Sequence, residues 1–463
     1  MTIRIYANSR TWKHTLLFLV LGTLISCTAT IARPHLVLAA LRSHNSSPLA
    51  IKWPAQEIVT PEEVGMDSDR LNRVTAAMQK LVDEGLLAGA VTMAARDNSI
   101  MHFESVGYRD LEARAPMTND TIFRIYSMTK PVTGVALMAL YEEGKFKLSD
   151  PVEKYIPEMK DLQVYTGINA DGSMITEDAN HKMTIRELMS HTGGLSYGIF
   201  SQSSVDTAYL EAGIGAAAAA GILAPNETGK DFVSKLGQIP LKSQPGSQWE
   251  YSVSVDVQGY LVEVLSGQKF SQFLDQRIFM PLNMRDTDFF VPEEKLNRFS
   301  QMYIYGEGGA LTSSEMFPGA DFTVPPAFES GGAGLVSTAS DYMRFGQMLL
   351  NGGELDGIRI LAPLTVDLMH RDQTPKAMAE SSLDQRGTAF GLDFAVILDP
   401  VEAESYSKGE YYWGGAAGTW FWVDPVEDIV FVGMIQVAGS LTPDVRGTSR
   451  RLLYQAIMDP NGI

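Results

Sequence analysis

Two pairs of short apolar segments, one near each end of the chain, constrain the fold more than any other feature. Residues 90–96 and 100–106 flank the turn-forming dipeptide Asp97-Asn98, a pattern that predicts two strands joined by a tight turn. A second strand pair is predicted near the C-terminus, at 419–423 and 429–437. Because strands at both ends must bury their apolar faces, we expect one sheet assembled from the two termini.

The middle of the chain is dominated by helical patterns. We therefore predict the α/β (α+β) class: an antiparallel sheet built from N- and C-terminal strands, flanked by helices, with a mainly helical lobe inserted at about 140–325. The polar stretch 163–183 is expected to form a surface loop, and the alanine run 216–220 a plain helix. Apolar residues at helical spacing, or apolar on nearly all sides, predict helices at 67–85, 132–141, 184–190, 255–266 and 339–350.

Composition excludes several classes of function. The 463 residues include 37 Lys+Arg and 55 Asp+Glu, so the net charge of −18 argues against nucleic-acid binding. The single cysteine, Cys27, excludes an internal disulfide framework and a cysteine-based zinc site. None of the 7 histidines lies within two to four residues of another, so metallohydrolase spacing is absent. We expect no metal and no cofactor.

The N-terminus indicates export. Basic residues precede the apolar run 16–25, which is too short to cross a bilayer and is typical of a secretory signal. The run ends Leu-Ile-Ser-Cys27, which resembles the lipobox of bacterial lipoproteins and implies lipidation and membrane anchoring through Cys27. An ordinary signal peptide or an uncleaved anchor is the alternative. We predict a signal at 1–27, a flexible tether at 28–55 and one catalytic domain at 56–460, in the periplasm or on a bacterial membrane.

Ser127 is the preferred nucleophile candidate. It begins the pattern Ser127-Met128-Thr129-Lys130, directly before the predicted buried helix 132–141. A helix N-terminus presents free N–H groups and a positive dipole end, which favour a developing negative charge. Lys130 lies one turn later on the same face and can accept the serine proton when it is uncharged, a state that burial favours. A second match, Ser405 to Lys408, has no following helix and is taken as accidental.

A rival serine lies in Gly194-Leu195-Ser196-Tyr197-Gly198. This segment fits the nucleophile elbow of α/β-hydrolases, which needs a strand before the serine, a helix after it, and an acid and a histidine downstream. The preceding segment 184–190 has helical spacing, and only His370 follows. We therefore favour Ser127.

Several motifs fall in the order of one superfamily. Over about residues 58–455 the chain resembles the serine β-lactamases and penicillin-binding proteins, in their class C branch. The motifs that carry this resemblance are Ser127-Met128-Thr129-Lys130, His191-Thr192-Gly193-Gly194-Leu195, Trp249-Glu250-Tyr251-Ser252, the Gly-rich stretch 331–338, and Trp413-Gly414-Gly415-Ala416.

The resemblance implies a role for each matched position. Ser127 would be the nucleophile, with Lys130 as its proton acceptor or electrostatic activator. Tyr251 would relay a proton to the leaving group, and the backbone N–H groups of Ser127 and Ala416 would form the oxyanion hole. The family has no catalytic histidine, so His191 is expected to hydrogen-bond its own loop.

Two departures from the lactam-hydrolysing members bear on the substrate. Val253 replaces an asparagine and Trp413 replaces a lysine, and both exchanges favour an uncharged ester over a charged amide. Trp413, Gly414 and Gly415 resemble the family VIII carboxylesterases, so these residues and Val253 are the candidates for substrate binding. We expect a serine hydrolase whose partner is a small-molecule ester. The alternatives are a D-alanyl-D-alanine carboxypeptidase or β-lactamase, an acyltransferase, and a non-catalytic penicillin-binding module.

Overall fold

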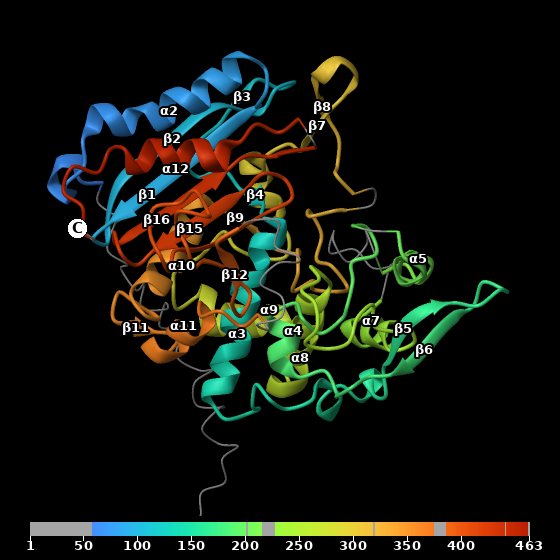
Figure 1. The fold of residues 1–463 in the computed structure, drawn as a ribbon. Coiled ribbons are helices and arrows are strands. Elements are labelled where there is room, and N and C mark those ends of the chain that lie inside the picture. The colour runs from blue at the N-terminus through green and yellow to red at the C-terminus, as the bar shows by residue number, and fades with distance from the viewer. Residues whose placement is uncertain are drawn as a thin grey trace, which may run out of the picture. The chain divides into compact units, whose positions relative to one another are not determined.

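An eight-stranded antiparallel sheet forms the centre of the fold (Figure 1). The computed structural model describes residues 58–200, 202–214, 227–317, 320–374, 386–439 and 441–461. Strand β16 pairs with β1, which joins the C-terminal strands to the N-terminal ones as the sequence predicts. In sheet order the strands are β12 Thr388–Phe390, β13 Ala395–Ile397, β14 Tyr411–Gly414, β15 Trp420–Asp424, β16 Ile429–Met434, β1 Gly89–Arg96, β2 Ser99–Asp110 and β3 Ala115–Pro116.

Local turn chemistry explains both predicted strand pairs. Asp97 and Asn98 have φ angles of 51° and 61°, which a two-residue turn between twisted antiparallel strands requires and which these residue types tolerate. At the other pair, Asp424 Oδ1 accepts hydrogen bonds from the backbone N–H groups of Val426 at 2.9 Å and Glu427 at 3.2 Å. Each turn is therefore specified by residues adjacent in the sequence.

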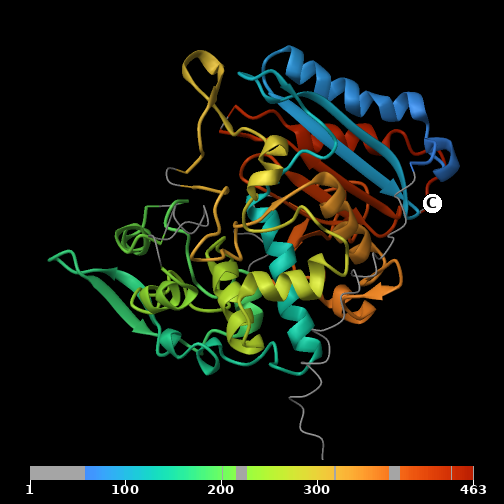
Figure 2. The same ribbon diagram turned by 180° about the vertical axis from the view of Figure 1, so that it is seen from behind.

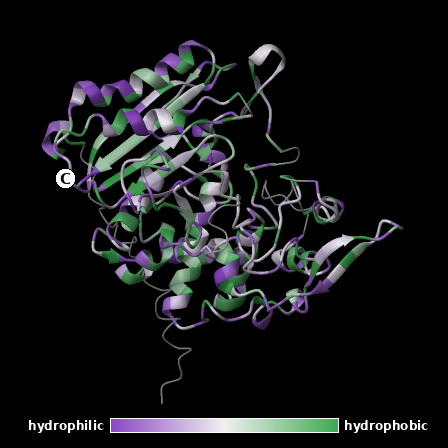
Figure 3. Cartoon of the chain, in the orientation of Figure 1, coloured by the Kyte–Doolittle hydropathy of each residue, from purple (hydrophilic) through white to green (hydrophobic). Residues whose placement is uncertain are grey.

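Helices cover both faces of the sheet. Helices α2 (Ser68–Asp83) and α12 (Val445–Tyr454) contact each other and pack on one face, against Trp420 and Trp422. Helix α10 (Ala339–Leu350) packs on the opposite face, against Phe421 and Val423. Neighbouring residues of a strand point to opposite faces of the sheet. Because helices cover both faces, the central strands β1, β15 and β16 are buried at every position, and their sequences are mainly apolar. Figure 3 shows these strands coloured as apolar and α2 with many polar residues.

The chain that connects α3 (Thr129–Glu142) with α10 forms a mainly helical lobe. Helix α8 (Ser254–Ser266) packs along α3, which is buried over its first twelve residues. The other helices of the lobe are α4 Ile185–Met189, α5 Ser204–Glu211, α7 Gly229–Leu236 and α9 Phe270–Leu274. Each helix predicted from apolar spacing is present, whereas the predicted alanine-run helix at 216–220 lies outside the described residues.

The expectation of a surface loop at 163–183 was wrong. This segment contains a hairpin of β5 (Gln163–Ile168) and β6 (Met174–Asp178), which protrudes from the lobe (Figures 1 and 2). Most of its side chains remain exposed, so the polar composition hides the strand pattern. Val164 is the exception: it is buried and forms a β-bridge with Leu241, which anchors the hairpin.

Shorter elements connect the sheet with the lobe. Strand β4 pairs with β9, and β7 pairs with both β8 and β17. The remaining strands are β4 Phe123–Arg124, β7 Tyr303–Tyr305, β8 Leu311–Ser313, β9 Val336–Ser337, β10 Glu354–Leu355, β11 Ile358–Arg359 and β17 Val437–Ala438. The remaining helical segments are α11 Pro363–Met369, a π-helical turn at Asp275–Phe279, and 3₁₀ turns at Pro61–Val64, Val152–Lys154, Pro157–Met159, Glu293–Arg298 and Glu307–Gly309.

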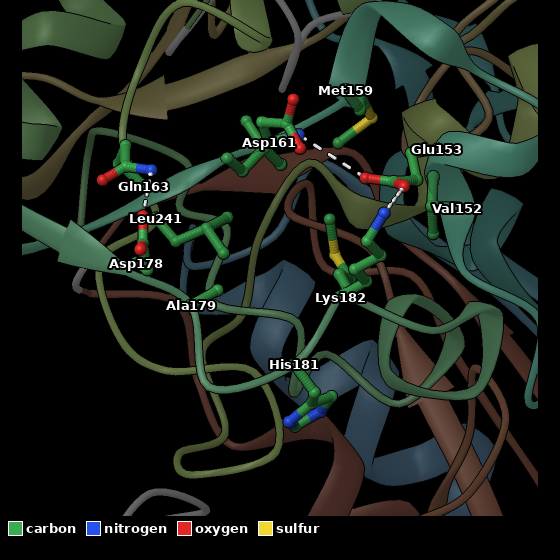
Figure 4. A pocket seen from close by; sticks show the side chains of 12 residues that line it. Val152, Glu153, Met159, Asp161, Gln163, Asp178, Ala179, His181, Lys182 and Leu241 are labelled. Carbon is green, nitrogen blue, oxygen red and sulfur yellow. Dashed lines mark hydrogen bonds and ion pairs between the residues drawn. The ribbon is translucent and has the colours of Figure 1, made fainter.

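A cavity of about 470 Å³ lies beside the base of the β5–β6 hairpin (Figure 4). Met159, Met183 and Leu241 contribute apolar surface, and Glu153 forms an ion pair with Lys182 at its edge. None of the candidate catalytic residues lines this cavity. Among the described residues, no helix combines the length and apolar character that crossing a bilayer requires.

Arg96 fastens the two ends of the domain to each other. Its side chain is 1% exposed, donates to Glu427 Oε2 at 2.9 Å, and also donates to the carbonyls of Val64 at 3.0 Å and Asp459 at 2.7 Å. A buried charge of this kind is tolerated only when its partners are in place.

We expect Arg96→Met to lower the free energy of unfolding by about 3 kcal/mol, because it leaves the Glu427 carboxylate without its cation in a buried place. Urea denaturation measures this loss. Lys80→Met is the control, since the Lys80–Glu84 pair spans 3.8 Å with the Lys80 side chain 73% exposed and should change stability by no more than about 0.5 kcal/mol. Equal losses in the two variants would contradict the role assigned to Arg96.

Candidate active site

Ser127 lies in a 3₁₀ turn, Tyr126–Met128, that leads directly into α3. The preceding residue, Tyr126, has φ = 41°, a conformation that is uncommon for a bulky side chain and indicates backbone strain beside the candidate nucleophile. The Ser127 side chain is partly exposed at the helix N-terminus, while its neighbours on both sides are buried. The structure therefore places this hydroxyl where the sequence pattern predicts it.

Lys130 is fully buried one turn further along α3. Its Nζ donates hydrogen bonds to Ser127 Oγ at 3.2 Å, Tyr197 Oη at 2.9 Å and the Gly332 carbonyl at 2.7 Å. A protonated lysine has three N–H donors, and each has an acceptor here. Burial of the charged group is thus offset by three hydrogen bonds.

Tyr251 completes the cluster from the segment just before α8. Its Oη donates to Ser127 Oγ at 2.7 Å, and Lys130 Nζ lies 4.7 Å from the centre of its ring. Ser127 is therefore within hydrogen-bond reach of both groups that the sequence predicts to move its proton. This spacing meets the geometric requirement for general acid–base catalysis.

Two members of the site were not predicted from the sequence: Tyr197 and Asp256. Tyr197 accepts a hydrogen bond from Lys130, and burial raises its pKa well above the ordinary value, with smaller contributions from Tyr251 and Asp256. Asp256 is fully buried in the first turn of α8, and burial raises its pKa to about 6. The available signals were a tyrosine directly after the rival serine, Ser196, and an acidic residue in the first turn of a mainly apolar helix.

His191 holds the tyrosine segment in place. It is fully buried with φ = 56°, and burial, followed by the charge of Lys130, lowers its pKa well below the ordinary value. Its Nδ1 lies 3.1 Å from Ser252 Oγ, and its carbonyl accepts from the Glu250 N–H at 2.8 Å. The sequence-based expectation was a bond within its own loop; the partners instead flank Tyr251, because the two loops fold against each other.

The rival serine, Ser196, is a structural residue. It is 4% exposed, and its Oγ donates to Asp206 Oδ1 at 2.5 Å. Its segment follows helix α4, whereas an elbow needs a preceding strand. His370, the downstream histidine, stacks on Tyr411 with ring centres 4.6 Å apart, whereas the Ser196 hydroxyl bonds to Asp206.

The end of β14 is pressed against the nucleophile turn. A Cβ atom at Gly415 would lie 2.3 Å from the Ile125 carbonyl oxygen, so only glycine fits there. Ala416 follows in an exposed turn and lines a hollow of about 230 Å³. The predicted oxyanion hole of Ser127 and Ala416 N–H groups remains a prediction, with its two segments side by side.

Two residues expected to bind substrate contact the protein instead. The side chain of Val253 is fully buried at the start of α8, which argues against contact with a ligand. A Cβ atom at Gly414 would lie 2.1 Å from Arg446 Nη2, so this glycine accommodates the arginine. The order of motifs along the chain does not reveal the direction in which the side chain of each residue points.

Aromatic rings surround Tyr251. Their centres lie 5.2 Å from it for Tyr197, 5.8 Å for Phe200, 6.1 Å for Trp249 and 5.5 Å for Trp413. Phe200 is 66% exposed and Trp413 is partly exposed, so both can offer apolar surface to a bound molecule.

Among the described residues, no group of three or more His, Cys, Asp or Glu side chains is arranged to hold a metal ion.

Comparisons with known proteins agree with this architecture. The family model described as Beta-lactamase matches residues 74–456. Protein Rv1367c of Mycobacterium tuberculosis is 36% identical, over 80% of this chain and 90% of its own length. Esterase EstB of Burkholderia gladioli is 30% identical, over 75% and 86% of the two chains. The solved structure of EstCE1, "a hydrolase with promiscuous acyltransferase activity", matches with a TM-score of 0.69 and 27% identity, over 84% and 99% of the two chains.

The family match spans the turn that carries Ser127, the segment that carries Tyr251, and strand β14, and the sheet with its inserted lobe matches the fold of EstCE1. The esterase and hydrolase relatives support a hydrolase or an acyltransferase. This chain therefore belongs to the Beta-lactamase family, within the superfamily of serine β-lactamases and penicillin-binding proteins, and is consistent with its family VIII esterase-like branch.

Proposed function

We propose that this protein cleaves carboxylic esters through an acyl-enzyme on Ser127. The observation that carries the proposal is the position of Ser127 Oγ, 3.2 Å from Lys130 Nζ and 2.7 Å from Tyr251 Oη. A serine hydroxyl is a weak nucleophile until a neighbouring group accepts its proton. Similarity to EstB and EstCE1 supports ester chemistry at this site.

The reaction proceeds in two stages. Ser127 Oγ attacks the ester carbonyl carbon while the lysine–tyrosine pair takes up its proton, and the N–H groups of Ser127 and Ala416 stabilise the oxyanion. Tyr251 then gives a proton to the departing alcohol oxygen as the carbon–oxygen bond breaks, which leaves an acyl group on Ser127. Attack by water, activated by the same tyrosine, releases the carboxylic acid and restores the serine.

The surroundings of Tyr251 favour an uncharged ester. Trp413 stands where lactam-hydrolysing relatives are expected to carry a lysine, and Phe200 adds exposed aromatic surface nearby. Such a wall gains from apolar contact but offers a carboxylate no ion pair. The net charge of −18 adds a long-range repulsion of anions, which salt screens.

A second candidate function is acyl transfer, in which an alcohol other than water accepts the acyl group. The printed description of EstCE1 names both activities for that protein. The same residues serve both outcomes, since only the second nucleophile differs. Product analysis with and without added alcohol separates them.

We further propose that residues 1–27 direct export and that Cys27 becomes lipidated, on the basis of the N-terminal sequence pattern alone. These residues lie outside the described part of the chain.

Ser127→Ala should lower the rate of p-nitrophenyl acetate and butyrate hydrolysis by roughly 10³-fold or more, because it removes the proposed nucleophile. Ser196→Ala is the matched control: it removes the buried bonds of Ser196 Oγ to Asp206 and to the Gly198 N–H, neither of which involves Ser127, and should keep turnover near wild type. Nitrophenol release measures both, alongside nitrocefin opening, which we expect to be slower than ester cleavage. Activity that survives in Ser127→Ala and disappears in Ser196→Ala would overturn the mechanism; nitrocefin turnover without esterase activity would overturn the substrate class.

Tyr251→Phe should lower kcat by roughly 10²–10⁴-fold with little change in KM, because it removes the proton-transferring phenol and keeps the ring. Tyr209→Phe is the control, since this buried phenol serves Ser196 N–H at 3.2 Å and not Ser127. Initial rates over a range of ester concentrations separate kcat from KM. A Tyr251→Phe enzyme with wild-type kcat would contradict the role.

The export proposal predicts that the mature chain begins at Cys27 and carries a lipid. Fractionation and intact-mass measurement of the full-length chain expressed in a bacterium test this. Cys27→Ala should release the protein from the membrane fraction, whereas an unprocessed cytoplasmic chain would contradict the proposal.

A further inference from the structure

Asp256 is linked to Lys130 through a single residue, Gly332. Its Oδ1 accepts hydrogen bonds from Ser330 Oγ at 2.5 Å and from the Gly332 N–H at 3.1 Å. The carbonyl of the same residue, Gly332, accepts the shortest of the three Lys130 hydrogen bonds, at 2.7 Å. When Asp256 fixes the N–H of Gly332, it therefore also fixes the position of the Gly332 carbonyl, which accepts from Lys130.

The Gly-rich loop is packed tightly on the first turn of α8. A Cβ atom at Gly332 would lie 2.6 Å from Asp256 Oδ2, and one at Gly331 would lie 2.4 Å from the Val255 carbonyl oxygen. Both positions therefore require glycine. The close approach brings the Asp256 carboxylate itself, and not only its hydrogen bonds, against the residue whose carbonyl binds Lys130.

The charges around Lys130 differ in kind. Burial raises the pKa of Asp256 and of Asp393 and lowers the pKa of His191. The charge of Lys130, a smaller effect, lowers the pKa of all three groups. Tyr197 and Tyr251 supply phenols. Burial raises the pKa of Asp256 to about 6, whereas burial raises that of Asp393 well above its ordinary value.

Asp256 and Asp393 differ in the groups that they bind. Asp256 has two donors on one oxygen, one of them the Gly332 N–H, and is ionised above pH about 6. Asp393 receives one side-chain donor, Gln258 Nε2 at 3.1 Å, which lies outside the Gly-rich loop. We therefore assign the counter-charge of Lys130 to Asp256.

We propose that Asp256 is a positioning residue that keeps Lys130 charged and aligned on the Gly332 carbonyl, so that Lys130 acts on Tyr251 and Ser127 as a cation. This inference rests on the proposed function, because it specifies how the same site activates Ser127. It leaves the tyrosine as the group that accepts the serine proton, with the nearby positive charge favouring its ionised form.

The test is the pH dependence of Ser127 labelling by a p-nitrophenyl phosphonate. Nitrophenol release measures the labelling rate, and peptide mass spectrometry locates the labelled residue. Asp256→Asn keeps an acceptor for Ser330 and Gly332 but removes the charge. We expect the alkaline fall in labelling rate to move to lower pH by about one to three units, the usual effect of an adjacent opposite charge. Below pH about 6 wild-type Asp256 is itself protonated, so there the two profiles should converge.

Asp393→Asn is the matched control, because it changes a second buried carboxyl group near Lys130 that is bonded to Gln258 and not to the Gly-rich loop; its profile should follow wild type. Ser330→Ala removes a hydrogen bond that lowers the pKa of Asp256. The pH profile of Ser330→Ala should therefore meet that of Asp256→Asn at a higher pH than the wild-type profile does. Thermal denaturation of each variant confirms folding.

A constant deficit of Asp256→Asn at every pH would reduce Asp256 to a structural role and overturn the inference, as would an equal shift in Asp393→Asn. These results leave the proposed function standing. Failure of wild-type Ser127 to be labelled at any pH would instead overturn the proposed function, and the inference with it.

Discussion

The buried amine of Lys130 is the group on which the rest of the site depends. Its acceptors come from three separate segments: Ser127 in the 3₁₀ turn before α3, Tyr197 in the lobe, and the Gly332 carbonyl in the Gly-rich loop. A charged group without water is stable only when each donor is satisfied. The burial of this lysine therefore forces three segments, distant in sequence, into one fixed arrangement.

The sheet and the lobe each supply half of the remaining geometry. Strand β14 reaches the nucleophile turn because Gly415 has no side chain to hold it away from Ile125. On the lobe side, His191 ties the tyrosine segment down through Ser252. The site therefore lies at the junction of two structural units, where rigid elements from both sides position the reacting groups.

The fold was predictable from the sequence to a large extent, and the site only in part. Strand pairs with their own turn residues and helices with apolar spacing are local signals, so both ends of the sheet and the main helices were predicted correctly. The β5–β6 hairpin was missed because it projects into solvent and shows little apolar alternation. The burial of the Val253 side chain could not be foreseen, because spacing places a residue along the chain and does not determine its direction.

The sequence by itself determined which hydroxyl, amine and phenol are available, and that Ser127 and Lys130 share one face of a helix, because helical periodicity is a property of neighbouring residues. Only the tertiary structure decided that Tyr197 and the Gly332 carbonyl receive the other two donors of Lys130, and that Asp256 supports that carbonyl. These contacts join residues far apart in the chain, and long-range packing, which no local pattern encodes, sets their distances.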